Sequence, residues 1–262
     1  MQTGKKRRLR RIFRDDGRAV IVPMDHGVTV GPVAGLVDIQ ETTDQLLKGG
    51  ADAILVHKGI ARVVDAGRAG LIVHLSASTQ LCPDSSCKVQ VCTVEEALRI
   101  GADAVSVHIN VGAEREGEML TKLARVADDC DRCSVPLLAM MYPRGPKIQS
   151  EHAPGVVAQA ARLGAELGAD IVKTNYTGDV TTFKEVVRGC PVPVIIAGGP
   201  FVKNPQDFLK MVHDSLEAGA SGVSIGRNVF QHRNPFAMTK ALSEIVHRHT
   251  PLEDALEILG EP

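Results

Sequence analysis

Short apolar runs rich in β-branched residues alternate along the chain with segments of helical hydrophobic periodicity. Near-continuous apolar runs of this kind are typical of strands buried on both faces, as in a parallel sheet covered by helices. The runs are 19–23, 53–57, 71–75, 104–108, 136–140, 170–173, 193–197 and 222–226. The pattern therefore predicts eight strands with helices between them.

The segments between these runs carry signals for helix ends. Thr93-Val-Glu-Glu96 and Thr182-Phe-Lys-Glu185 match the capping box, and Asn204-Pro205 pairs an N-cap residue with a proline at the first helical position. Several expected helices end at a glycine directly before the next strand, and these sites are Gly50-Ala-Asp52, Gly101-Ala-Asp103, Gly168-Ala-Asp170 and Gly219-Ala-Ser221.

Eight strand–helix units in a chain of this length are typical of a (β/α)8 TIM barrel, which usually needs about 250 residues. The step from the second strand to the third is short, so we expect a stunted second helix. A doubly wound open sheet is the alternative, but no G-x-G-x-x-G follows the first strand. We predict a single α/β domain over residues 1–262, with residues 1–17 as a short, basic, helical N-terminal extension.

The composition is that of an ordinary globular protein, with 44% hydrophobic and 23% charged residues and a net charge of -1. No apolar run approaches the roughly 20 residues that span a bilayer, and the start lacks the apolar core of a secretory signal. We therefore expect a cytoplasmic protein with no membrane partner. Cys130-x-x-Cys133 has metal or redox spacing, but no second pair completes a zinc set, and free thiols are the expected state.

The first residues are strongly basic, with six charges between Lys5 and Arg11. They fit an amphipathic helix whose charges face solvent while Leu9, Ile12 and Phe13 point inward. A nucleic-acid site and a subunit interface are the alternatives. Nucleic-acid binding is disfavoured because only 3% of the residues are aromatic, and we expect no nucleic-acid partner.

Catalytic residues of a barrel lie at the carboxyl ends of the strands. Gly198-Gly199 follows the seventh expected strand, and Gly226-Arg227 follows the eighth. Glycines there let backbone N–H groups approach a phosphate, assisted by the following helix N-terminus, and an arginine adds a bidentate clamp. Ordinary turn chemistry also requires glycine, but the position favours phosphate binding.

Lys173 stands at the end of the sixth expected strand, where an apolar residue is usual. It is a surface lysine, a phosphate-contacting cation or a Schiff-base nucleophile, because burial lowers the pKa of a lysine and leaves the free amine that attacks a ketone. Tyr142 on the adjacent strand and Asp25 across the mouth supply an acid and a base. Together these groups indicate carbon–carbon bond chemistry on a phosphorylated keto sugar.

A metal site is the alternative at this mouth, with the ligands His26, His57, His74 and His108. These histidines lie on four different strands and lack a carboxylate-rich spacing. We therefore expect no metal and no other cofactor.

The motifs at the strand ends resemble those of the archaeal-type class I aldolase family. They are IVPMDHG (21–27), VHKG (56–59), HINVG (108–112), MMYPRG (140–145), VKTNYTGD (172–179), IAGGP (196–200) and GRNVFQH (226–232). The resemblance implies that Lys173 forms the Schiff base, Tyr142 donates a proton and Asp25 accepts one. It implies sugar-phosphate contacts from Asp25, His26, Gly27, Val28, Thr29, Tyr142, Pro143, Arg144, Gly198, Gly199, Gly226 and Arg227.

The resemblance also implies a transaldolase-like activity. A deoxy-hexodiulose phosphate forms an imine, a phosphorylated three-carbon aldehyde leaves, and the enamine adds to L-aspartate 4-semialdehyde. One related branch uses dihydroxyacetone phosphate with the same aldehyde. Another, the fructose-bisphosphate aldolases, has tryptophan where this chain has Met140. A non-catalytic sugar-phosphate-binding protein is the alternative of another class. Family members tend to be ring-built decamers, which implies a homo-oligomer.

Overall fold

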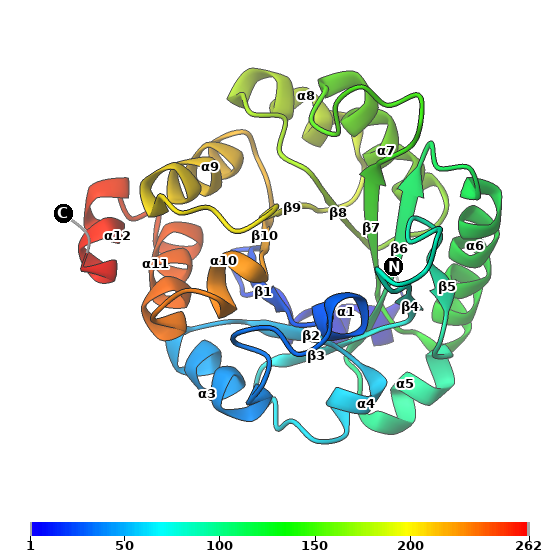
Figure 1. Cartoon of the computed structure of the whole chain (residues 1–262), viewed down its shortest axis with the longest axis horizontal. Coiled ribbons are helices and arrows are strands. Elements are labelled where there is room, and N and C mark those ends of the chain that lie inside the picture. The colour runs from blue at the N-terminus through cyan, green and yellow to red at the C-terminus, as the bar shows by residue number, and fades with distance from the viewer. Residues whose placement is uncertain (1, 261–262) are drawn as a thin grey trace.

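Eight parallel strands close into a barrel surrounded by helices in the computed structural model, which describes residues 2–260 (Figure 1). Around the barrel the strands follow the order β1-β10-β9-β8-β7-β6-β3-β2. Their bounds are β1 Ala19–Pro23, β2 Ala53–His57, β3 Gly70–His74, β6 Ala104–Val111, β7 Leu137–Pro143, β8 Ile171–Thr174, β9 Val194–Ala197 and β10 Gly222–Ser224. The predicted TIM barrel is confirmed, and each of its strands overlaps one of the eight predicted runs.

The helices form the outer layer of the barrel. Those that link successive strands are α3 Ile39–Gly49, α4 Lys58–Ala61, α5 Val94–Ile100, α6 Glu116–Cys133, α7 Pro154–Glu166, α8 Val180–Gly189 and α9 Pro205–Glu217, and α11 Pro235–Arg248 follows β10. Further helices are α1 Thr3–Leu9, α2 His26–Val30, α10 Arg227–Phe230 and α12 Leu252–Leu259. The expected stunted second helix is α4, with four residues.

One feature was not predicted. Between β3 and α5 the chain forms a small antiparallel pair, β4 Ser76–Ala77 and β5 Val89–Gln90, outside the barrel.

Most of the predicted helix ends are confirmed. Thr93 and Asn204 accept hydrogen bonds from backbone N–H groups at the starts of α5 and α9. The glycines before β2, β6, β8 and β10 all have left-handed φ values, between 96° and 102°. The capping box at Thr182 is wrong, because α8 begins earlier and Asp179 accepts the hydrogen bond from the N–H of Thr182 at 2.9 Å.

The inside of the barrel is filled by apolar side chains from alternate positions of the strands. This inner cluster comprises Ala19, Ile21, Ala53, Leu55, Ile72, Ala104, Leu138, Met140, Tyr142, Ile171 and Ile195, and it includes Ile12 from the N-terminal segment. Residues of the opposite parity pack against the helices. The N-terminal segment therefore contributes to the interior of the barrel.

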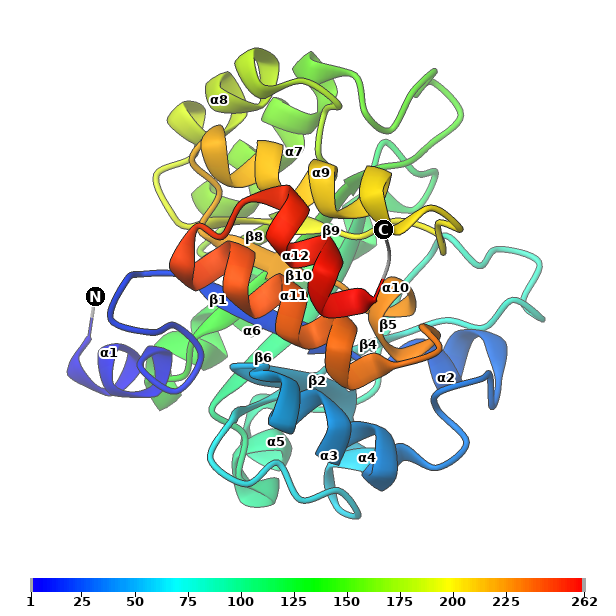
Figure 2. The same cartoon turned by 90° about the vertical axis from the view of Figure 1, so that its left-hand side faces the viewer.

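Basic side chains of this segment pair with the aspartates that precede three strands. Lys5 Nζ lies 2.8 Å from Asp170, Arg11 Nε 2.9 Å from Asp103, and Arg14 Nε 2.5 Å from Asp52. Those carboxylates also accept hydrogen bonds from the first residue of β7 and from the second residues of β3 and β1, at 2.7–3.0 Å. The segment thus closes the end of the barrel where the strands begin, and Figure 2 shows α1 on the side opposite α2, β5 and α10.

The expectation that Leu9, Ile12 and Phe13 point inward is confirmed, because Ile12 is fully buried and the other two pack against the same inner cluster. The expected helix ends at Leu9, before Ile12 and Phe13, and the expectation that the charges face solvent is wrong for part of them. Lys5 is only 4% exposed, and the guanidinium of Arg8 donates to the carbonyl of Ala102. These cations therefore bind aspartates and backbone carbonyls of the same chain instead of facing solvent.

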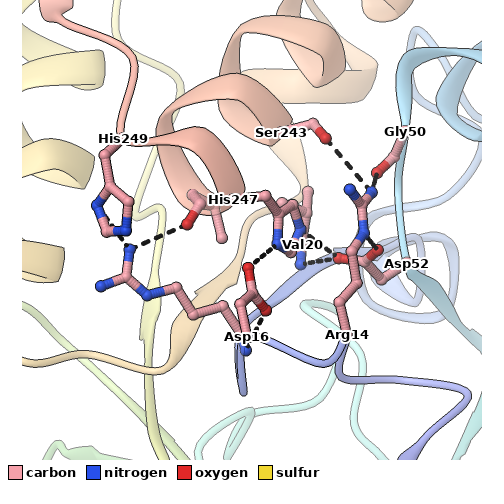
Figure 3. A network of polar contacts seen from close by, with 10 residues as sticks. Arg14, Asp16, Val20, Gly50, Asp52, Ser243, His247 and His249 are labelled. Atoms are coloured by element: carbon pink, nitrogen blue, oxygen red, sulfur yellow. Dashed lines mark hydrogen bonds and ion pairs between the residues drawn. The ribbon is translucent and has the colours of Figure 1, made fainter.

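Around Asp52 the network extends to the C-terminal part of the barrel (Figure 3). His247 on α11 bridges Asp16 and Asp52, with contacts of 2.7 and 2.9 Å from its two ring nitrogens. Arg14 also donates to the carbonyl of Gly50. The network connects the N-terminal segment, the start of β2 and the last helix of the barrel wall.

Within residues 2–260 no helix is long and apolar enough to cross a membrane.

Candidate active site

The opposite end of the barrel, where the strands end, contains a cavity of about 300 Å³. Its wall includes the residues singled out at the strand ends of β1, β7, β8, β9 and β10: Asp25, His26, Thr29, Tyr142, Arg144, Lys173, Gly198, Gly199, Gly226 and Arg227. Gly27 and Val28 line a neighbouring cavity on the other side of α2, and Pro143 is buried at the end of β7. The structure therefore brings most of the predicted residues together around one space.

Lys173 points from β8 into this cavity and is only 5% exposed. It pairs with Met140 on β7 and Ile195 on β9, so its side chain takes the inward direction of the apolar residues below it. Burial lowers its pKa to about 8, against the attraction of Asp25 and with the help of the positive charges of Arg144 and Arg227. An appreciable fraction of the side chain is therefore free amine near neutral pH.

Tyr142 lies on the adjacent strand, two residues beyond the partner of Lys173 and on the same inward face. The guanidinium of Arg144 stacks over its ring at 4.7 Å, and the ring of His108 meets it edge-on at 5.0 Å. Burial raises the pKa of the phenol above its usual range. Tyr142 is therefore protonated at neutral pH, as a proton donor must be.

Asp25 follows β1, four strands around the barrel from Tyr142. Its carboxylate lies 3.8 Å from His74 Nε2 and 3.4 Å from His26 Nδ1. Burial opposes ionisation, but the fields of His74, His26 and Lys173 lower the pKa of this carboxyl below its usual range. Asp25 is therefore an ionised base facing the amine across the cavity.

The mouth histidines named as alternative metal ligands contact other groups. His74 shares a hydrogen bond of 2.7 Å with Ser106, and His108 one of 2.8 Å with Asn110. Burial lowers the pKa of His74 to about 3. Among residues 2–260, three side chains of the metal-binding types lie close enough together to share an ion. They are His213, Asp214 and Glu217 on the outer helix α9, and none of the mouth histidines is among them.

The cysteine pair lies away from the mouth, near the end of α6. Cys130 is buried, and burial raises the pKa of its thiol. All six cysteines are free.

The glycine loops after β9 and β10 lie against each other at the mouth. A Cβ on Gly198 would come within 2.6 Å of Ile225, and one on Gly226 within 2.6 Å of the carbonyl of Pro23. Arg227 donates to the carbonyl of Gly199 at 3.1 Å, which joins the two loops. Close packing thus requires glycine at these positions and leaves the loop backbone exposed to the cavity.

Sequence reasoning missed Asn228, which holds these loops in place. Its amide donates to the carbonyls of Gly198 and Pro200, and its side-chain oxygen accepts from the N–H of Val202. The residue is 3% exposed. A buried amide directly after the Gly226-Arg227 turn was the available signal, since such a group requires several partners.

Comparison with known proteins agrees with this geometry. The family model described as DeoC/LacD family aldolase matches residues 19–232. This chain belongs to that family. It is 49% identical over 259 residues to a 2-amino-3,7-dideoxy-D-threo-hept-6-ulosonate synthase of Halobacterium salinarum, covering 98% of this chain and 97% of that protein. It is 47% identical over 244 residues to a 2-amino-4,5-dihydroxy-6-oxo-7-(phosphonooxy)heptanoate synthase of Streptomyces griseus, covering 92% and 89%.

A solved structure with a similar fold shows the covalent chemistry that such a barrel can carry out. The barrel is similar, with a TM-score of 0.87 and 38% identity, to an archaeal fructose-1,6-bisphosphate aldolase whose catalytic lysine is covalently bound to the carbinolamine intermediate. The similarity covers 92% of this chain and 99% of that structure. This chain is accordingly an enzyme of the Schiff-base, class I type of aldolase.

Proposed function

We propose that this aldolase condenses an enamine derived from a ketose phosphate with L-aspartate 4-semialdehyde, as a 2-amino-3,7-dideoxy-D-threo-hept-6-ulosonate synthase. The observation that carries the proposal is the buried Lys173, whose pKa is lowered to about 8, in one cavity with Tyr142 and Asp25. The 49% identity to the synthase of Halobacterium salinarum supports the choice of reaction.

The first half of the proposed reaction forms and breaks bonds at the ketone of a deoxy-hexodiulose phosphate. The free amine of Lys173 attacks the ketone carbon, and Tyr142 donates a proton to the carbinolamine oxygen, which leaves as water. Asp25 then removes the proton from the substrate hydroxyl on the far side of the scissile bond. That bond breaks, its electrons pass to the iminium nitrogen as an enamine, and a phosphorylated three-carbon aldehyde leaves.

The second half builds the new carbon–carbon bond. The enamine carbon attacks the aldehyde carbon of L-aspartate 4-semialdehyde, and the new alkoxide takes the proton held by Asp25. Water then adds to the iminium carbon and its proton returns to Tyr142, and collapse of this carbinolamine releases the product and restores the amine of Lys173. In this mechanism the enzyme supplies a free amine, an acid and a base, and excludes bulk water from them.

The glycine loops and Arg227 are proposed to bind the phosphate of the ketose. Their backbone is exposed to the cavity, and a guanidinium is suited to phosphate because of its planar donor geometry. Asp25, His26, Thr29, Tyr142 and Arg144 line the same cavity, and the contacts proposed for them complete its wall.

A second candidate reaction starts from dihydroxyacetone phosphate, and it is favoured by the 47% identity to the Streptomyces griseus synthase. A comparison of donors tests both candidates, with L-aspartate 4-semialdehyde as the common acceptor. We expect product from 6-deoxy-5-ketofructose 1-phosphate. Product from dihydroxyacetone phosphate alone would establish the second reaction, and cleavage of fructose 1,6-bisphosphate alone would contradict both.

We further propose a cytoplasmic homo-oligomer. The six free thiols and the exposed Val37, Leu81, Phe201 and Phe236 support this assignment. Light scattering coupled to size exclusion tests it, since a mass of 28.0 kDa would indicate a monomer.

A further inference from the structure

The cavity has a lysine that the proposed reaction steps leave unused. Lys88 lies in the connection between β3 and α5, directly before β5, and lines the same cavity as Lys173 and Arg227. β3 and β9 are four strands apart around the barrel, so this connection and the loop of Gly198 and Gly199 approach the mouth from opposite sides. Figure 1 shows β5 beside β6 and well separated from β9 and β10.

Lys88 lacks an acidic partner. Within the described residues 2–260, no carboxylate lies within 4.0 Å of its ammonium, and its hydrogen-bond partner is the hydroxyl of Ser78. Arg144, on the same rim, has a carboxylate partner, Glu151, at 2.7 Å. Lys88 is half-buried, so its ammonium loses part of its hydration without gaining a counter-ion. An anion bound in the cavity would offset this unfavourable desolvation.

The backbone around Lys88 is fixed from behind. Lys122 on α6 is 7% exposed, and its ammonium donates to the carbonyls of Lys88 at 2.5 Å and of His108 at 3.1 Å. This bridge ties the start of β5 to β6. The hydroxyl of Ser78 donates to the carbonyl of Ser85 at 2.7 Å, so the group that contacts the ammonium is itself held. These hydrogen bonds therefore hold the backbone and the ammonium of Lys88 in place at the cavity.

Lys88 also faces the reacting groups. Lys88, His108 and Tyr142 line the same cavity, and Lys122 bridges the carbonyls of Lys88 and His108. The ring of His108 in turn lies against Tyr142 at 5.0 Å. A molecule next to Tyr142 on the side away from the glycine loops is therefore within the field of Lys88.

We propose that Lys88 is a binding residue for the carboxylate of the acceptor aldehyde, in an anion subsite separate from the glycine loops. This inference rests on the proposed function. An acceptor that is an amino-acid semialdehyde has its aldehyde at one end and a carboxylate at the other. With the carboxylate on Lys88, the aldehyde extends toward Tyr142 and Lys173, where the enamine remains after the phosphorylated aldehyde has left.

The test compares acceptors that differ in charge. Lys88→Gln removes the ammonium, and Lys147→Gln is the matched control because Lys147 is exposed on the same rim but does not line the cavity. Each enzyme is assayed with L-aspartate 4-semialdehyde, with succinate semialdehyde, which keeps the carboxylate, and with propanal, which lacks it. The donor is 6-deoxy-5-ketofructose 1-phosphate throughout.

We expect Lys88→Gln to lower kcat/KM about 10- to 100-fold for the two carboxylate aldehydes, the usual effect of losing a hydrogen bond to a charged group. The effect on propanal should stay within about 3-fold, and Lys147→Gln should change none of the three. Lys88→Arg, which keeps the charge, should restore a large part of the preference for carboxylates.

An equal loss for all three aldehydes would overturn the proposal, because it would indicate a structural role for Lys88. A loss at the step of imine formation with the donor would also overturn it, because it would place the ketose phosphate on Lys88. Borohydride trapping of the donor separates this proposal from the proposed function. If the unchanged enzyme traps no adduct, the function fails, whereas normal trapping with an unaltered acceptor preference in Lys88→Gln refutes the acceptor subsite alone.

Discussion

Asp170 directly precedes β8, and Lys173 is the third residue of that strand. Asp170 binds the ammonium of Lys5 at the closed end of the barrel, at 2.8 Å, and Lys173 points into the cavity at the mouth. The two lysines are almost equally buried, at 4% and 5% exposure. Burial alone would lower both pKa values, but Asp131 and Asp170 raise that of Lys5 whereas Lys173 falls to about 8. Partners decide which lysine is structural and which is a nucleophile.

Replacement of Lys173 by Met should abolish turnover and stabilise the protein at pH 7. The folded enzyme holds this ammonium with a pKa of about 8 instead of 10.5, so folding disfavours the charged form. Each unit of that difference corresponds to about 1.4 kcal/mol, and we expect a gain of roughly 1–3 kcal/mol in the free energy of unfolding. Denaturant titrations measure it, with Lys147→Met as the exposed control.

The pH dependence of that gain follows from the same two pKa values. Below pH 8 the lysine is protonated in both the folded and unfolded states, and the full penalty applies. Between pH 8 and 10.5 the folded protein releases the proton first, and the penalty disappears. The stability difference between Lys173→Met and the unchanged enzyme should therefore shrink as pH rises through this window, and a constant difference would contradict the assigned pKa.

Replacement of Lys5 by Met should destabilise the barrel. The carboxylate of Asp170 would lose its counter-ion while still bound to the N–H of Leu137 inside the protein. We expect a loss of roughly 2–4 kcal/mol, the range for removing one partner of a largely buried ion pair. Lys6→Met, at an exposed neighbouring position, should change stability by less than about 0.5 kcal/mol. Equal effects of the two substitutions would refute the role assigned to Lys5.

The positive charge of Arg144 should influence the reactivity of Lys173. This guanidinium lowers the pKa of Lys173, so Arg144→Gln should raise that pKa above about 8. Competitive labelling of amines over a range of pH, with mass spectrometry of the peptide that contains Lys173, measures the midpoint without substrate. Arg115→Gln, which breaks an exposed pair with Glu118, is the control and should leave the midpoint unchanged.

Replacement of Tyr142 by Phe should separate catalysis from structure. The ring contacts with His108 and Arg144 remain, so the melting temperature should change little. Loss of the hydroxyl removes the proposed proton donor, and kcat should fall by about 10²–10⁴-fold. Full activity in Tyr142→Phe would assign the proton transfer to another group.

The barrel strands were predictable because strands buried on both faces consist of almost continuous apolar residues. Lys173 was recognisable for the same reason, as a charge at the end of such a run. The β4–β5 pair was missed because its strands have two residues each and Val89 and Gln90 are exposed. No hydrophobic periodicity marks such short strands, and Lys88 lies directly before β5.

The closure of the barrel by the N-terminal segment was also missed. The basic residues were visible, but their partners Asp52, Asp103 and Asp170 are distant in sequence. The Gly-Ala-Asp repeats were interpreted only as helix ends, although their aspartates also bind strand backbones and cations. The capping box predicted at Thr182 was wrong, because α8 begins earlier in the chain and Asp179 is a better N-cap residue than Thr182.

Borohydride reduction in the presence of 6-deoxy-5-ketofructose 1-phosphate tests the central claim most directly. We predict one reduced adduct per chain, located on Lys173 by peptide mass spectrometry, and its absence in Lys173→Met. An adduct on another lysine, or donor binding without any adduct, would contradict the assignment of Lys173 as the Schiff-base residue.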